Sequence, residues 1–571
     1  MKKADLVLIN GKVLSVALDG TVTRNEAVAV KDGKILAVDD MRKIGEYIGD
    51  GTEVMDCRGN TVLPGLCDDH CHASFSASTY AGCDLFNVFQ EDGESNEDVI
   101  KKYTDRLEVY IEKNPDAAVI RGTGWNRAWF NGSNGENRTP DRHDLDKICD
   151  GKPIVLESYC QHNIWVNTKA IELSGLTADT PTPETGVIHR ESDGYPAGIF
   201  EETSAMELIK ENLPGYDYTV DQYRQVILKY QRELANSYGV TLICDAFHTE
   251  NAREAYKQLA AEGKLTVRVR GVYPLDNSRA EEDWQEALSR KGKDTVGDLF
   301  GINTVKMFME GEPCMMEPYN EEVNRVNGKP EDYCGNIFWT EEEGVHYMSE
   351  AIKNGFQIHM HSMGDRTVKR SIDCLEKAQQ YSGGDDRNII AHLMAVREED
   401  IERMGRLNIS CSCQPRWMVH DTDVEDFYRP CFGDKRALRF YPNKSFEDAG
   451  CVVGYGTDFP ITPPPDPFHE IQCAMTRSVF PDAPDYERFK GRVLAEEERV
   501  DLYQAIRALT INGAYQNFLE ETTGTIEAGK SADMVVLDCD IETMPVEEIY
   551  SIRAQTTVFK GKTVYSRHQQ R

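Results

Sequence analysis

Two histidines separated by one residue follow a short apolar run near the start of the chain. The run Val62–His72 is interrupted by Pro64 and Gly65 just ahead of the histidines. Alternate side chains of an extended strand share a face, so His70 and His72 point the same way. At the end of a buried strand, such a pair can hold a borderline-soft divalent metal. On a surface loop the same pair would do nothing, and the motif alone leaves both readings open.

Four more residues suited to metal binding or proton transfer end predicted strands later in the chain: Lys306, His361, His392 and Asp458. Each also has an ordinary reading. A strand-end histidine is more often a hydrogen-bonded core residue, and Asp458 could cap a helix. A buried lysine such as Lys306 is costly unless it is paired or chemically altered. One solution is uptake of carbon dioxide, which gives a carbamate able to bridge two metals.

Together these side chains predict a centre with one or two divalent metal ions, with zinc the expected metal. One ion would be held at one side of the centre by His70, His72 and Asp458. The second would be held by His361 and His392, with carboxylated Lys306 as the link. A metal-activated water would attack a carbonyl carbon, and Asp458 is the expected general base.

Seven further strand-like segments follow the histidine pair, separated by polar segments rich in helix formers. They are residues 239–245, 266–273, 303–309, 356–361, 388–392, 408–414 and 451–458. With the strand before His70 they make eight strands alternating with helices, the pattern of a (β/α)8 TIM barrel. Barrel enzymes place their chemistry where the strands end, and the six candidate residues lie there.

The two ends of the chain have short strands of a different style. Asn10-Gly11 and Asp32-Gly33 are hairpin signals, and strands return at 531–538 and 553–565. One β-sandwich built from both chain ends would satisfy all of these strand edges.

A long segment separates the first barrel strand from the second and exceeds one ordinary connection. It is therefore expected to be an insertion that covers the barrel mouth. The expected units are a composite β-sandwich of 1–62 and 518–571, a barrel of 63–517 and, within it, an insertion of 74–238.

Composition limits the classes of partner. The formal net charge of −33 over 571 residues disfavours nucleic acid and anionic membrane surfaces, which carry the same sign. No run is long and apolar enough for a membrane span, and no signal segment precedes the first strand. Sixteen scattered cysteines suit a reduced compartment, so a cytoplasmic enzyme acting on a small molecule is expected.

Several motifs resemble the amidohydrolase superfamily, and within it amidohydrolase family 3, over nearly the whole chain. They include the segments 63–72, 161–167, 197–202, 305–311, 361–365, 414–415, 456–458 and 524–537. The resemblance implies a metal-dependent hydrolase with a barrel and a composite β domain. It implies the six residues above as the metal and catalytic set, with carboxylation of Lys306. Glu310 departs from the family, which usually has Asp there.

The resemblance also implies that Trp125, His162 and Glu202 of the insertion face the substrate, although they could equally hold the insertion together. It suggests a homodimer. An N-formyl or N-acyl amine is the first expected substrate, followed by cyclic amides and esters. Aromatic residues of the insertion would suit an apolar substituent, or form an ordinary core.

The sequence leaves two other functions as alternatives. A mononuclear deaminase or cyclic amidase of the same fold is the runner-up. The sequence Ser362-Met363-Gly364-Asp365 after His361 disfavours a deaminase, because such enzymes usually have a nearby Glu there. The third, a scaffold without activity, would be expected to have lost ligands, and none of the six is missing.

Overall fold

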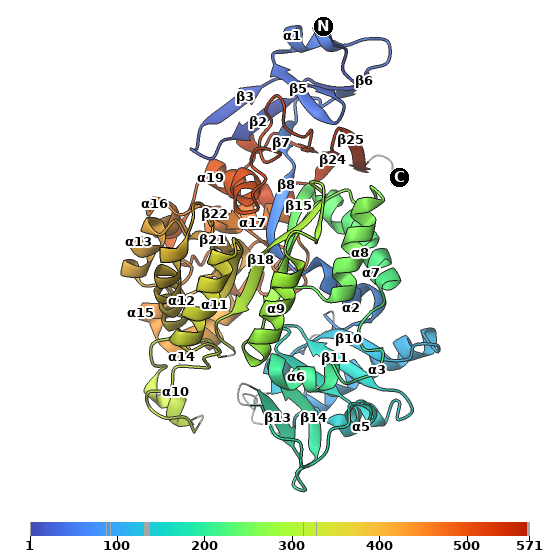
Figure 1. Ribbon diagram of the computed structural model, residues 1–571, viewed down its shortest axis with the longest axis vertical. Helices are drawn as coiled ribbons and strands as arrows, with labels where there is room; N and C mark the ends of the chain where they lie inside the picture. The colour runs from blue at the N-terminus through green and yellow to red at the C-terminus, as the bar shows by residue number, and fades with distance from the viewer. Residues whose placement is uncertain are drawn as a thin grey trace.

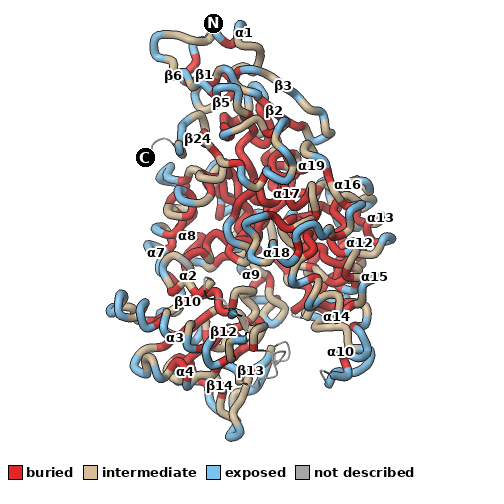
Figure 2. Tube along the Cα trace, turned by 180° about the vertical axis from the view of Figure 1, so that it is seen from behind, coloured by how far each residue is buried: buried red, intermediate tan, exposed pale blue. Residues whose placement is uncertain are grey.

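The chain folds into three parts stacked along one axis. The computed structural model describes residues 2–567 except 87, 89, 92, 131–137, 184, 185, 312 and 327. A β unit with both chain ends lies at the top of Figure 1, the barrel in the middle and the insertion below. Buried residues fill the barrel and continue into both neighbouring parts (Figure 2).

Eight parallel strands form the barrel, and each coincides with a predicted strand. In chain order they are β8 (Leu66–Cys71), β15 (Val240–Asp245), β16 (Arg268–Leu275), β18 (Phe300–Phe308), β19 (Gln357–Ser362), β20 (Ile389–His392), β21 (Ser410–Cys413) and β22 (Val453–Tyr455). Each pairs with the next in this order. The predicted (β/α)8 barrel is confirmed.

Helices follow the strands and cover the outside of the barrel. They are α7 (Val220–Tyr230), α8 (Glu250–Ala261), α9 (Ala280–Arg290), α11 (Glu341–Lys353), α12 (Asp365–Ala378), α13 (Glu398–Arg406), α16 (Asn443–Asp448), α17 (Pro467–Thr476) and α19 (Leu502–Arg507). Helix α12 shows why: Val368, Ile372 and Leu375 are buried at helical spacing along one face. Such an apolar stripe is stable only when it packs on the strands.

The barrel closes where the chain after β22 meets β8. The amide of Asp458 donates to the carbonyl of His70 (2.8 Å), and the amide of His72 donates to the carbonyl of Phe459 (2.7 Å). We call this contact the closing seam. It joins the first and last barrel strands by backbone hydrogen bonds.

Two glycines allow the closing seam to form. A Cβ on Gly454 would lie 1.8 Å from Oδ2 of the buried Asp69, and one on Gly456 would lie 2.4 Å from the amide nitrogen of His70. Real Cβ atoms do not approach so closely. The sequence Gly-Tyr-Gly therefore lets the last strand lie directly against the first.

The insertion has its own six-stranded sheet. In sheet order its strands are β13 (Val187–Arg190), β14 (Pro196–Glu201), β12 (Asn163–Val166), β11 (Ile154–Ser158), β10 (Ile120–Trp125) and β9 (Cys83–Asp84). Its helices include α2 (Ser76–Ala81), α3 (Asn96–Lys113), α4 (Arg142–Asp146), α5 (Thr168–Leu173) and α6 (Thr203–Lys210). In Figure 1 this sheet lies beneath the end of the barrel to which β8 descends.

The β unit is built from both ends of the chain, as predicted. One sheet has the order β5 (Lys34–Asp39), β4 (Ala27–Lys31), β1 (Leu6–Ile9), β6 (Glu53–Asp56). The other has the order β25 (Lys562–Ser566), β24 (Ala554–Phe559), β23 (Met534–Leu537), β7 (Thr61–Pro64), β2 (Lys12–Val16), β3 (Val22–Asn25). The two chain ends meet where β7 pairs with β23, for example Leu63 with Val535. The unit boundaries given above stay predictions.

One of the two hairpin signals is confirmed and the other is wrong. Asp32-Gly33 joins the antiparallel strands β4 and β5 with positive φ at both residues, as a tight hairpin needs. Asn10-Gly11 instead carries the chain from β1 in one sheet to β2 in the other. An Asn-Gly or Asp-Gly dipeptide predicts a local turn, but it does not predict which strands pair on either side of that turn.

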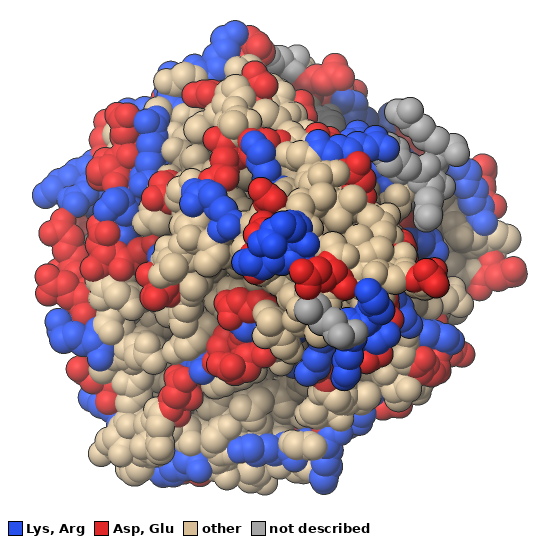
Figure 3. Space-filling view, turned by 90° about the horizontal axis from the view of Figure 1, so that it is seen from above, with Lys and Arg blue, Asp and Glu red and all other residues tan. Residues whose placement is uncertain are grey.

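The surface of the β unit mixes both charges. Lys and Arg side chains are interleaved with Asp and Glu on the face shown in Figure 3. Among the helices within the described residues, none combines the length and apolar character that crossing a bilayer requires.

Gly454→Ala tests the closing seam. The added methyl group would push Asp69 away from the last strand, and we expect the free energy of unfolding to fall by about 3 kcal/mol. Urea unfolding followed by circular dichroism measures this. Gly383→Ala is the matched control, because nothing lies within 4 Å of its Cβ position. Equal stability of the two variants would contradict the steric argument.

Candidate metal centre

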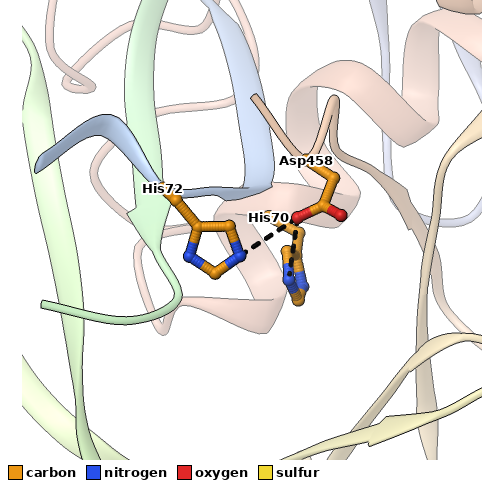
Figure 4. Close-up of side chains that lie close together, drawn as sticks. All are labelled: His70, His72 and Asp458. Carbon is orange, nitrogen blue, oxygen red and sulfur yellow. Dashed lines mark ion pairs between the residues drawn. The ribbon is translucent and has the colours of Figure 1, made fainter. Parts of the chain in front are cut away.

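The closing seam brings three of the predicted ligands together. His70 lies in β8, His72 directly follows β8, and Asp458 follows β22. Asp458 Oδ1 lies 3.1 Å from His72 Nε2 and 3.5 Å from His70 Nε2. One ligand atom of each lies within 4.8 Å of the others, and all three residues are buried. Figure 4 shows both imidazoles turned toward this carboxylate.

The other three candidates lie next to this group. His361 is in β19 and His392 ends β20. The ring of His392 lies 4.8 Å from that of His70 and 4.4 Å from that of His361. Lys306 in β18 is near enough for its positive charge to lower the pKa of all three histidines. The fold therefore brings all six predicted residues to one end of the barrel.

Burial sets the protonation of these groups. It lowers the pKa of His70 and His361 well below the usual range and that of His392 to about 4. Burial also lowers the pKa of Lys306 to about 8, although the charge of Asp458 opposes the shift. Neutral imidazoles have a lone pair to offer, and a lysine with a lowered pKa has more neutral amine.

Several polar atoms of the described residues are buried at this point without a hydrogen bond. Within the described part of the chain, His70 Nε2, Lys306 Nζ and Asp458 Oδ1 make no hydrogen bond. Buried polar atoms are nearly always paired in stable proteins. Imidazole nitrogens beside a carboxylate and a lysine that can become an anionic carbamate form a donor set that suits Zn2+ or a similar ion. The residues therefore fit the implied metal.

Two supporting residues were not assigned a role from sequence. His359 Nε2 lies 3.0 Å from His70 Nδ1, and Gln414 Oε1 lies 2.9 Å from His392 Nδ1. Each contact fixes the orientation of an imidazole and leaves its Nε2 facing the centre. The available signals were the alternation of His359 with His361 in one strand and the position of Gln414 directly after β21.

Backbone strain marks the same region. His392 (φ 76°) and Asp458 (φ 54°) adopt the left-handed conformation that non-glycine residues avoid. Glu202 does so as well (φ 68°). Strained residues of this kind cluster at functional sites, where the surrounding structure holds them in place.

Glu310 ties together the loops after β18 and β19. Its carboxylate accepts backbone hydrogen bonds from Met315 (2.7 Å) and Gly364 (3.2 Å), and further hydrogen bonds from the Met363 amide and the Thr367 hydroxyl. Burial raises the pKa of Glu310 to about 7. The departure from the family's usual Asp thus supplies a longer side chain that reaches the loop behind His361.

The insertion brings a histidine–carboxylate pair to the barrel mouth. His162 precedes β12 and Glu202 follows β14, and His162 Nδ1 lies 3.0 Å from Glu202 Oε2. The charge of His162 lowers the pKa of His361, so the pair lies close to the centre. A Cβ on Gly311, beyond the end of β18, would lie 3.1 Å from Glu202 Cδ.

The structure places Trp125 in the core of the insertion, which is the second of the two roles that the sequence left open, and its contact with a substrate stays a prediction. Its side chain is fully buried, and its indole nitrogen donates to the carbonyl of Leu156 (3.0 Å). Its ring packs 5.9 Å from that of Trp165, in a core that also holds Phe130. Trp125, Trp165 and Phe130 therefore belong to the hydrophobic core of the insertion.

Acidification of the metal-free protein tests the burial of His392. Its pKa falls from 6.5 to about 4 on folding, so its contribution to stability is complete above pH 6.5 and is lost as the pH falls toward 4. The stability advantage of the parent over His392→Gln should shrink by about 3 kcal/mol across this window.

Guanidinium unfolding at several pH values measures this difference. His346→Gln is the control, because its ring is exposed on α11. A pH profile of His392→Gln parallel to that of the parent would show that His392 is not held neutral.

Known proteins are similar to this chain in sequence and in fold. A sequence model described as the amidohydrolase family matches residues 53–565. The chain is 26% identical over 563 residues to the putative amidohydrolase YtcJ of Bacillus subtilis, spanning 95% of this chain and 96% of that protein. It is 25% identical over 574 residues to the N-substituted formamide deformylase of Arthrobacter pascens, spanning 99% and 98%.

A solved structure has the same fold. It is an uncharacterized metal-dependent hydrolase from Pyrococcus horikoshii, with a TM-score of 0.72 at 22% identity, covering 95% of this chain and 99% of that one. The family match covers the barrel and the part of the β unit from residue 53 onward. The chain belongs to the amidohydrolase family and is a hydrolase of carbon–nitrogen bonds.

Proposed function

We propose that this enzyme cleaves the amide-type C–N bond of a small N-formyl or N-acyl amine with the help of one or two divalent metal ions. The observation that carries the proposal is the buried group of His70, His72 and Asp458 at the closing seam. A relative that spans almost the whole chain is named an N-substituted formamide deformylase, which supports this substrate class.

The ligand sets follow from the positions of the side chains. His70, His72 and Asp458 would hold the first ion, and His361 and His392 the second. Lys306, as a carbamate, would link them. When bound, zinc would acidify a water molecule near neutral pH and polarise the substrate carbonyl. The centre is buried, so each of these electrostatic effects is stronger than it would be in bulk water.

Asp458 carries the proton in this mechanism. Its Oδ1 accepts the proton of the attacking water as the C–O bond forms, and returns it to the nitrogen as the C–N bond breaks. The products are a carboxylic acid, ionised at neutral pH, and an amine. The left-handed backbone and the hydrogen bond to His70 fix the carboxylate in this position.

The histidine–carboxylate pair of the insertion would act on the substrate. Glu202 orients His162 through Nδ1, so that Nε2 is directed away from the carboxylate. From its position near His361, His162 would contact the acyl oxygen or the leaving nitrogen. Two units of the chain would then contribute to one site.

A single-metal enzyme of the same fold, a deaminase or cyclic amidase, is the second candidate. The three ligands at the closing seam form a compact group without His361 and His392, which favours this alternative. Elemental analysis distinguishes the two: two metals per chain support the first proposal and one supports the second.

A substrate screen with Asp458→Asn tests the proposal. The zinc-loaded enzyme should hydrolyse N-formyl or N-acetyl amines faster than lactams and esters, and a chelator should abolish the activity until zinc is restored. Asp458→Asn should lower kcat/KM by about 10²–10⁴-fold, because an amide cannot take up the proton. Asp482→Asn, an exposed carboxylate, is the matched control. Full activity of Asp458→Asn would refute the general base.

Carboxylation of Lys306 can be seen directly. Enzyme loaded with zinc in the presence of carbon-13 bicarbonate should give a carbamate signal in the carbon-13 NMR spectrum, because the lowered pKa favours the neutral amine. Lys306→Met should lack the signal, whereas Lys329→Met, which removes an exposed lysine, should keep it. A parent spectrum without a carbamate signal would show that Lys306 stays unmodified.

A cytoplasmic location is part of the proposal. All 16 cysteines lie within the described residues as free thiols, and most are buried. Unpaired thiols in this number suit a reducing compartment.

A further inference from the structure

A cavity lies beside the predicted metal centre, between the insertion and the barrel. Its volume is about 840 Å3, the size of a small-molecule site. The insertion contributes α6 and the loop 213–218, and the barrel contributes the loops after β15 and β16. The lining residues do not include the six predicted ligands.

Three phenylalanines form the inner wall of this cavity: Phe75, Phe247 and Phe308. Phe75 stacks on the ring of His72 at 5.3 Å, and Phe308 lies 5.3 Å from the ring of His361. Phe247 bridges them, 5.4 Å from Phe75 and 6.3 Å from Phe308. A molecule in the cavity would therefore touch rings that pack against two predicted metal ligands.

Carboxylates outnumber cations in the cavity lining. Eight acidic side chains line the cavity, against the four cations Arg121, Lys210, Arg253 and Arg279. Three of the cations already have acidic partners at 2.6–3.2 Å, in the pairs Lys210–Glu157, Arg253–Glu286 and Arg279–Asp283. Arg121 donates to backbone carbonyls of the loop 213–218.

Two carboxylates of the cavity lining belong to different units and lie close enough for their negative charges to interact. Glu207 comes from α6 of the insertion and Asp276 follows β16 of the barrel, and within the described residues neither makes an ion pair. Asp276 accepts a hydrogen bond from the Ser278 amide (2.8 Å). Burial raises the pKa of Glu207 to about 7, and the negative charge of Asp276 adds to this shift. A cation between the two carboxylates would remove this repulsion.

A buried histidine supplies a separate sign of a ligand. His248, in the loop between β15 and α8, lines the cavity and is 2% exposed. Neither of its ring nitrogens has a hydrogen-bond partner in the described part of the chain. Buried imidazoles without partners are uncommon in stable proteins, so a polar group of a bound molecule is expected beside this ring.

We propose that this cavity binds an organic ammonium ion with an apolar body. Its charged group would lie between Glu207 and Asp276, and its body on the phenylalanine wall. The catalytic meaning rests on the proposed function: hydrolysis of an N-acyl amine gives a carboxylate and an amine that protonates at neutral pH. The cavity would hold this amine half, which becomes a cation only after the C–N bond is broken.

Calorimetry with two probes of the same shape tests the proposal. Metal-loaded enzyme is titrated with 2-cyclohexylethylammonium and with 2-cyclohexylethanol, which lacks the charge. We expect saturable binding of the ammonium ion and at least about tenfold weaker binding of the alcohol, the effect of one partly buried charge pair.

Two variants locate the site. Glu207→Gln and Asp276→Asn should each weaken ammonium binding about tenfold without changing binding of the alcohol. Glu282→Gln is the matched control, because it removes an exposed carboxylate of α9 outside the cavity. A melting curve of each variant checks that it folds. If a variant does not fold, the comparison of the two probes on the parent enzyme still tests the proposal.

Three results would overturn the proposal: no saturable binding, equal affinity for both probes, or unchanged ammonium affinity in both variants. Hydrolysis of N-acyl amines is measured separately. An enzyme that hydrolyses them without binding the ammonium ion refutes the cavity alone. One that binds the ion and hydrolyses no amide refutes the proposed function alone.

Discussion

The closing seam is the constraint on which both the fold and the site depend. The hydrogen bonds that join β8 to the chain after β22 are made by the backbones of His70, His72 and Asp458 themselves. The same seam is reinforced by Asp68, whose carboxylate accepts from the amide (2.9 Å) and the hydroxyl (2.6 Å) of Thr457. Closing the barrel and assembling the three ligands are therefore one structural event.

The seam also explains why so many titratable groups can be buried at one place. A polar atom buried without a partner costs about 1–3 kcal/mol, and several lie at the rim. Supporting contacts from His359 and Gln414 fix the imidazoles, and Glu310 fixes the loops behind them. The unpaired polar atoms lower the stability of the fold, and the same arrangement holds the side chains in place to bind a cation.

The barrel and its ligand positions were predictable because the signals are local. Each strand is a short apolar run between polar segments, and each ligand lies at the end of one.

Which elements lie next to each other in space was harder to predict from the sequence. The turn at Asn10-Gly11 looked like a hairpin because a bend is encoded locally, whereas the choice of partner strand depends on the whole sheet. The role of Trp125 stayed open because the sequence does not show which face of the insertion sheet is covered, and the structure places its ring in the core. The presence of Glu207 and Asp276 in the lining of one cavity, although they belong to different units, is not visible in any local sequence pattern.

The pairing of β7 with β23 has a consequence for synthesis on the ribosome. Strand β7 leaves the exit tunnel early, but its neighbour around Val535 is translated only near the end. The edge of β7 in the six-stranded sheet therefore stays unpaired while the barrel strands are synthesised, and an unpaired strand edge can bind a wrong partner strand. Chains that stop short of β23 would keep that edge exposed, so the last part of the polypeptide protects the first.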